Sequence, residues 1–97
     1  TQLVIATITS DANNYANQIY KKFKENNIRV DLDLRNEKIG YKIREHSNAK
    51  IPILLVLGKK EVEQKSVSIR RLGSKNTESK SLDEIIPLIV KEAKAPN

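Results

Sequence analysis

Hydrophobic and polar residues follow one another along this chain in patterns that predict alternating strands and helices. Residues 3–8 and 51–57 are apolar on both faces, which is typical of parallel strands covered by helices on each side. Residues 28–33 alternate between apolar and polar, which predicts a strand with one polar face. Apolar residues recur every three or four positions over residues 12–23, and a basic segment at 37–45 follows the second strand, so helices are predicted in both places.

The C-terminal half predicts a returning strand, a loop and a last helix. Residues 66–70 alternate after a short connection, which favours an antiparallel strand. Residues 73–80 are rich in Ser, Lys, Asn and Thr and predict a loop. A capping-box pattern begins the last helix at Ser81, and Pro87 predicts either a kink or a helix that starts near Ile86. The fold class is therefore α/β, with a parallel core of about three strands and an antiparallel addition.

The positive charge is concentrated in one half of the chain. The formal net charge is +6, and residues 35–80 hold twelve Lys or Arg against five Asp or Glu. Such a distribution fits a nucleic-acid binder and an ordinary solvated basic surface about equally well. With no cysteine, one histidine and three glycines, the chain disfavours disulfides, thiol nucleophiles and multi-histidine metal sites, and excludes phosphate-binding glycine loops. The sequence also predicts no membrane-spanning segment.

The segment at 33–45 is the strongest candidate binding site. A helix N-terminus attracts anions, and four basic residues surround this one, which suits a polyanion: Arg35, Lys38, Lys42 and Arg44. Gly40 costs a helix about 1 kcal/mol relative to alanine, so it predicts either packing against a strand or close approach of a ligand backbone between Tyr41 and Arg44. Asn36 is either a helix N-cap or a contact to a base edge.

Two further pairs of residues allow both a functional and an ordinary interpretation. Glu61 and Arg70 match the donors and acceptors of guanine, but a surface ion pair explains them as well. Asp31 and Asp33 share one face of a strand and suit Mg²⁺ in a receiver-like enzyme, but ion pairs with neighbouring arginines explain them better.

Six groups of residues, taken in order, resemble a known family. They are residues 28–30, 33–45, then Pro52, Leu55, Val56 and Gly58, then 60–63, 67–71 and 81–84, and the most specific run is Asn36-Glu37-Lys38-Ile39-Gly40. Together they resemble the C-terminal anticodon-binding domains of class II aminoacyl-tRNA synthetases, most closely those of threonyl-tRNA synthetases. The resemblance implies a mixed, mainly parallel five-stranded sheet flanked by three helices. It also implies that residues 1–97 form a single domain, a fragment from the C-terminal end of a larger chain.

The resemblance implies a module that recognises the anticodon loop of tRNA(Thr) and has no catalytic site of its own. The parent enzyme would attach threonine using ATP, Mg and Zn held outside this domain, as a cytoplasmic homodimer with no membrane contact. The implied partners are the tRNA(Thr) anticodon stem-loop and the catalytic domain of the same chain. The alternative is an accessory or protein-interaction module that reads no tRNA.

The resemblance also implies roles for individual residues. The implied contacts to anticodon bases are Asn36, Glu61 and Arg70. For the RNA backbone the resemblance implies contacts with Lys38 and Arg44. The position and charge of the neighbouring residues extend this predicted set to Arg35, Gly40, Tyr41, Lys42 and Arg71.

Overall fold

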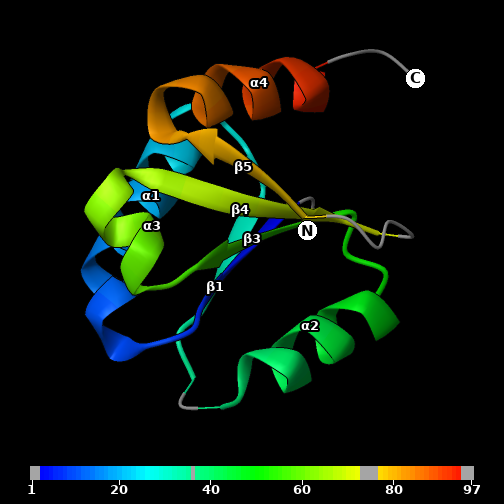
Figure 1. Ribbon diagram of the computed structural model, residues 1–97. Helices are drawn as coiled ribbons and strands as arrows, with labels where there is room; N and C mark the ends of the chain where they lie inside the picture. Colours follow the sequence, from blue (N-terminus) through cyan, green and yellow to red (C-terminus); the bar gives the residue numbers. More distant parts are fainter. Residues whose placement is uncertain (1–2, 36, 73–76, 95–97) are drawn as a thin grey trace.

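The chain folds around one five-stranded sheet in the computed structural model, which describes residues 3–35, 37–72 and 77–94 (Figure 1). The strands are β1 (Leu3–Thr7), β2 (Val30–Asp33), β3 (Ile53–Leu57), β4 (Ser66–Arg71) and β5 (Thr77–Ser81). The helices are the 3-10 turn η1 (Ser10–Ala12), α1 (Asn13–Glu25), α2 (Ile39–Asn48), α3 (Lys59–Gln64) and α4 (Leu82–Lys94).

The strands lie in the order β2-β1-β3-β4-β5. β1 is parallel to both of its neighbours, and Leu3 lies opposite Val30 on one side and Ile53 on the other. β4 then pairs antiparallel with β3, and β5 antiparallel with β4. The predicted α/β class, the three-strand parallel core and the antiparallel return are therefore confirmed, as is the five-stranded mixed sheet.

Helices cover the two faces of this sheet unequally (Figure 1). α1 and α4 pack on one face, where the main hydrophobic core lies, whereas α2 packs alone on the other. The main core includes Leu3, Ile5, Tyr15, Ile19, Phe23, Leu55, Leu57, Val67, Ile69, Ile85 and Ile89, all buried. The smaller core under α2 joins four buried sheet residues to three half-buried isoleucines: Val4, Ala6, Leu54, Val56, Ile39, Ile43 and Ile51.

The first helix follows its predicted pattern. Tyr15, Ile19 and Phe23 point into the core, and Asn27 adopts φ 61° just after the helix, which is the left-handed stop expected of an asparagine there. The connections through α1 and α2 cross opposite faces of the sheet. In such sheets ligands bind outside the carboxyl ends of the parallel strands, at the point where the connections from two neighbouring strands leave to opposite faces of the sheet.

Two elements were not predicted from the sequence. Residues 77–80, predicted to be a loop, form most of β5, and the short α3 lies between β3 and β4, so the predicted count of three helices is wrong. The sequence of β5 has no apolar alternation because most of this edge strand is exposed on both faces. α3 is only one or two turns long, too short for a helical period to be recognised.

The last helix begins earlier than the proline suggested. α4 starts at Leu82 and continues through Pro87, so a start near Ile86 is wrong. The backbone N–H of Glu84 donates to Ser81 Oγ at 3.3 Å, in agreement with the predicted cap. A proline here removes one hydrogen bond to the carbonyl of Asp83, and both residues are exposed, so water can bond that carbonyl.

Candidate nucleic-acid interface

The outer face of α2 is the most accessible part of the candidate interface. Gly40, Tyr41 and Arg44 are all exposed on it, and Lys38, the N-cap residue, is exposed just before it. The Tyr41 ring is 52% exposed, which makes it one of the few large hydrophobic side chains open to solvent. The helix thus presents two cations and an aromatic ring over its first two turns. Asn36, predicted to contact a base, lies outside the described residues.

Gly40 lies in the first turn of α2, and nothing in the part of the chain that the structure describes packs against it. A Cβ atom built at this position would meet no described atom within 4 Å beyond its chain neighbours and its own helix. Of the two explanations that the sequence left open, packing against a strand is therefore excluded. Close approach of a ligand backbone stays a prediction, for which this geometry leaves room.

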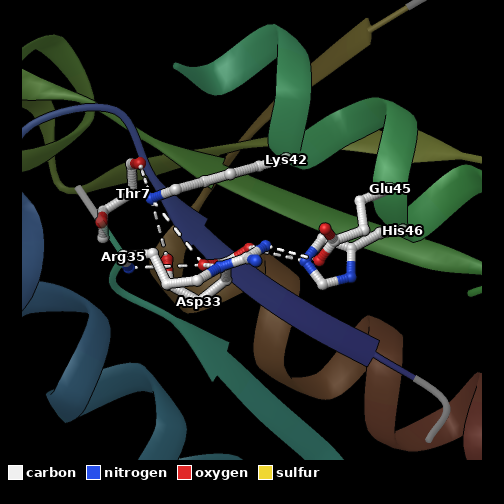
Figure 2. Close-up of polar contacts among 6 residues, drawn as sticks. All are labelled: Thr7, Asp33, Arg35, Lys42, Glu45 and His46. Carbon is white, nitrogen blue, oxygen red and sulfur yellow. Dashed lines mark hydrogen bonds and ion pairs between the residues drawn. The ribbon is translucent and has the colours of Figure 1, made fainter. Parts of the chain in front are cut away.

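Lys42, predicted to contact the RNA backbone, is buried instead. Its side chain is only 1% exposed, and its ammonium donates to the carbonyl oxygens of Thr7 at 2.8 Å and Asp33 at 3.1 Å (Figure 2). Burial lowers the pKa of the ammonium, while the nearby Asp33 carboxylate acts in the opposite direction. This placement corrects the prediction, because a buried ammonium cannot reach a phosphate on the surface.

Arg35 is held by two carboxylates. Its Nε and Nη2 donate to Asp33 Oδ1 and Oδ2, both at 2.8 Å, and Nη2 also donates to Glu45 Oε1 at 2.7 Å (Figure 2). His46 Nε2 lies 2.7 Å from Asp33 Oδ2. We call these four residues the Asp33 cluster: Asp33, Arg35, Glu45 and His46.

The Asp33 cluster shifts the ionisation of its members. The hydrogen bonds from Arg35 hold the pKa of the Asp33 carboxyl far below its usual range, and the same bonds raise the pKa of Arg35. The pKa of Glu45 is lowered, first by its bond with Arg35 and then by one with Tyr41, which raises the pKa of the Tyr41 hydroxyl. Both Asp33 oxygens are bonded to Arg35, so the carboxylate serves an ion pair with a side chain and not a metal site. Among the described residues no group of His, Cys, Asp or Glu could hold a metal ion.

Glu61 and Arg70 do not form a pair. Glu61 is 8% exposed and its Oε1 accepts a hydrogen bond from the backbone N–H of Gly58 at 2.7 Å, which caps α3. Arg70 lies opposite Leu54 in the sheet, whereas Glu61 lies in α3, which follows the end of β3, and the two side chains share no ion pair. An RNA that contacts both side chains must therefore reach both α3 and β4.

Arg70 and Arg71 point to opposite faces of the sheet. Arg70 shares the face of Leu54, on the side of α2, and lies beside Thr77 of β5. Arg71 lies near α4 on the other face, where its Nη2 pairs with Glu92 Oε1 at 2.9 Å. The Arg71 side chain, predicted to contact the RNA backbone, is therefore directed toward α4 and away from the face that carries α2 and Arg70.

A polar cavity opens where β1 and β2 end. Its volume is about 380 Å³, and its walls include Thr7, Ser10, Asn13 and Arg35. Asn13 Oδ1 is the one buried side-chain oxygen or nitrogen without a hydrogen-bond partner in the part of the chain that the structure describes.

The sequence interpretation missed the positions of Asp33, Glu45 and His46. A signal was present, because Ile39, Lys42 and His46 recur at helical spacing and so share the inner face of α2. That spacing places Lys42 and His46 against the sheet. Lys42 was instead predicted to lie on the surface because it is charged.

Comparison with known proteins relates the chain to one family. Residues 2–92 match the family described as "Anticodon binding domain". The chain is 51% identical over 96 residues to a threonine–tRNA ligase of Paramagnetospirillum magneticum (strain ATCC 700264 / AMB-1) and 53% identical to one of Brucella canis (strain ATCC 23365 / NCTC 10854 / RM-666). Each match covers 99% of this chain but only 15% of the relative. The chain therefore spans a small part of the length of these relatives.

Solved structures share the same fold. The RNA-binding domain of threonyl-tRNA synthetase from Cryptosporidium parvum Iowa II superposes with a TM-score of 0.89 at 25% identity, covering 98% of this chain and 24% of that one. Prolyl-tRNA synthetase from Cryptosporidium parvum superposes with a TM-score of 0.82 over 95% of this chain and 21% of that one. At 20% sequence identity, this similarity shows a shared fold only. Among the described residues, no helix has the length and apolar character needed to cross a membrane.

Proposed function

Because this chain belongs to the anticodon-binding domain family, we propose that it is the tRNA anticodon-recognition module of a threonine–tRNA ligase. The family match over residues 2–92 carries this proposal. The exposed first turn of α2, with its cations and open glycine, supports it independently. The ligase activity would belong to a parent chain, and the ATP, threonine, Mg and Zn sites would lie in its catalytic domain. The catalytic domain of the same chain would be one partner of this domain. The parent enzyme would be a cytoplasmic homodimer.

RNA recognition would use two kinds of contact, to phosphates and to bases. Lys38 and Arg44 are exposed cations beside Gly40, so they suit phosphates, which supply affinity that falls with salt. Arg70 projects from the sheet on the same side as α2, and its guanidinium matches O6 and N7 of guanine or O4 of uracil. Glu61 can contribute a base contact only through its second oxygen, since Oε1 caps α3. The sequence-based assignment of Asn36 to a base stays a prediction.

We expect Arg70→Ala to reduce discrimination between anticodons. The variant should lose about 1 to 3 kcal/mol of binding free energy for a tRNA(Thr) anticodon hairpin, and much less for a hairpin with the matched base replaced. Fluorescence anisotropy with both hairpins, at two salt concentrations, measures this difference. Arg71→Ala is the matched control, because Arg71 is the next residue, carries the same charge and lies on the other face. Equal losses for both hairpins with Arg70→Ala would remove Arg70 from the base contacts.

Gly40→Ala should separate stability from binding. Alanine is the better helix residue by up to about 1 kcal/mol, and its Cβ meets no neighbouring atom, so the free energy of unfolding should rise slightly. The same methyl group would obstruct an RNA backbone that passes over Gly40, so affinity for the hairpin should fall. Denaturant unfolding and anisotropy measure the two effects, with Ser47→Ala near the C-terminus of α2 as the control. Unchanged affinity would mean that RNA does not approach this glycine.

A further inference from the structure

The cations near the first turn of α2 fall into two classes. Lys38 and Arg44 have no ion pair with any residue that the structure describes, so their charge is available to a ligand. Arg35 differs because two carboxylates already bind its guanidinium. A phosphate could bind Arg35 there only by displacing one of these carboxylates. Its sequence-based assignment to the RNA backbone therefore fits this geometry poorly.

The Asp33 cluster instead joins three parts of the chain. Asp33 ends β2, Arg35 belongs to the turn that follows, and Glu45 and His46 belong to α2 (Figure 2). On the same helix, Lys42 is bonded to the carbonyls of β1 and β2. α2 is thus tied to the sheet by polar bonds at both its second and its later turns.

These bonds have a consequence for the exposed face of α2. The apolar contacts under the helix come mainly from Ile39 and Ile43, and such contacts are not directional. Hydrogen bonds are directional, so those of Lys42, Glu45 and His46 determine how the helix is rotated about its own axis. That rotation decides where Tyr41 and Arg44 point. The Arg35–Glu45 pair is largely exposed, and such pairs add little to stability.

We propose that Arg35 and Glu45 are positioning residues of the RNA site. They fix the rotation of α2, so that Lys38, Tyr41 and Arg44 meet the RNA. Glu45 takes this role although it is an acid beside a site for a polyanion. The proposal rests on the function proposed above.

The test uses two glutamates that electrostatics alone would treat alike. Glu45→Ala and Glu37→Ala each remove one negative charge near the same surface, so charge alone predicts tighter binding of RNA in both. A positioning role for Glu45 instead predicts that the two variants differ in their affinity for RNA. Affinity for the tRNA(Thr) anticodon hairpin should fall severalfold, up to about fivefold, with Glu45→Ala, and should stay equal or rise with Glu37→Ala. Glu45→Gln keeps an oxygen that can accept from Arg35 and should bind nearly as the unmodified protein does.

Salt dependence gives a second readout. The double variant Arg35→Gln with Glu45→Gln keeps the net charge, and it should weaken binding without changing the slope of log affinity against log salt. Arg44→Gln should reduce that slope by about 1, as loss of a phosphate contact does. Thermal unfolding of each variant shows whether the fold is retained.

The outcomes are distinguishable. Tighter binding by Glu45→Ala, as by Glu37→Ala, would overturn the proposed positioning role while leaving the RNA site intact. So would a reduced slope in the charge-neutral double variant. Failure of the unmodified protein to bind the hairpin would overturn the proposed function and this role together.

Discussion

Replacing Lys42 with methionine is expected to lower the free energy of unfolding by about 1 to 3 kcal/mol, which is the usual cost of leaving a buried hydrogen-bonding group without its partner. The Lys42 ammonium is 1% exposed, bonds the carbonyls of Thr7 and Asp33, and lies 4.0 Å from Asp33 Oδ1. Methionine keeps the apolar stem but leaves two buried carbonyls without this donor. Since small domains have a total stability of about 5 to 15 kcal/mol, the loss should be large.

Urea unfolding followed by circular dichroism measures this effect. Arg44→Met is the matched control, because Arg44 is a cation on the same helix, two residues later, and is exposed. We expect a change within about 0.5 kcal/mol for it, as for most surface substitutions. Similar small changes for both variants would show that desolvation of the Lys42 ammonium offsets its bonds in the folded protein.

Asp33→Asn is the second substitution with a large expected effect, and its effect should depend on pH. Arg35, His46 and Lys42 all face the Asp33 carboxylate, and at pH 7 its removal should cost about 3 kcal/mol. The pKa of Asp33 in the folded protein lies below its ordinary value, mainly because of the bonds from Arg35. A carboxyl of this kind stabilises the fold above the unfolded pKa of about 3.9, and this contribution is lost as pH falls below it.

Unfolding measurements from pH 7 to pH 2 test this prediction. The unmodified protein should lose stability steadily below about pH 5, whereas Asp33→Asn should lose less, so that the two curves converge in acid. Asp11→Asn, at an exposed aspartate, is the control at pH 7 and should change stability by within about 0.5 kcal/mol. A difference between the unmodified protein and Asp33→Asn that stays constant with pH would show that Asp33 acts through packing instead of charge.

The parts of the fold that depend on hydrophobic periodicity were predictable from the sequence. The α1 stripe of Tyr15, Ile19 and Phe23 and the continuous apolar runs of β1 and β3 led directly to the parallel core. β5 escaped prediction because an exposed edge strand has no buried face and therefore no alternation. α3 escaped because its end is set by Lys65 at φ 53°, a left-handed conformation that lysine rarely signals.

The candidate site was predictable only in part, because charge alone does not say which side of a helix a basic residue occupies. Arg44 and Lys42 carry the same charge two positions apart, yet one is exposed and the other is buried. Arg70 and Arg71 are adjacent, yet the pleat of the strand sends them to opposite faces. In each pair the periodicity of the helix or strand, and not the charge, determines which side each residue faces.

The composition of the outer strands bears on how this protein behaves at high concentration. β2 and β5 end the sheet on either side, and both carry charged side chains, Asp31 on β2 and Glu78 and Lys80 on β5. A strand from a second molecule that added to either border would have to bring its own side chains against these charges, which opposes growth into aggregated β-structure. We expect the protein to remain monodisperse where a sheet with apolar borders would precipitate.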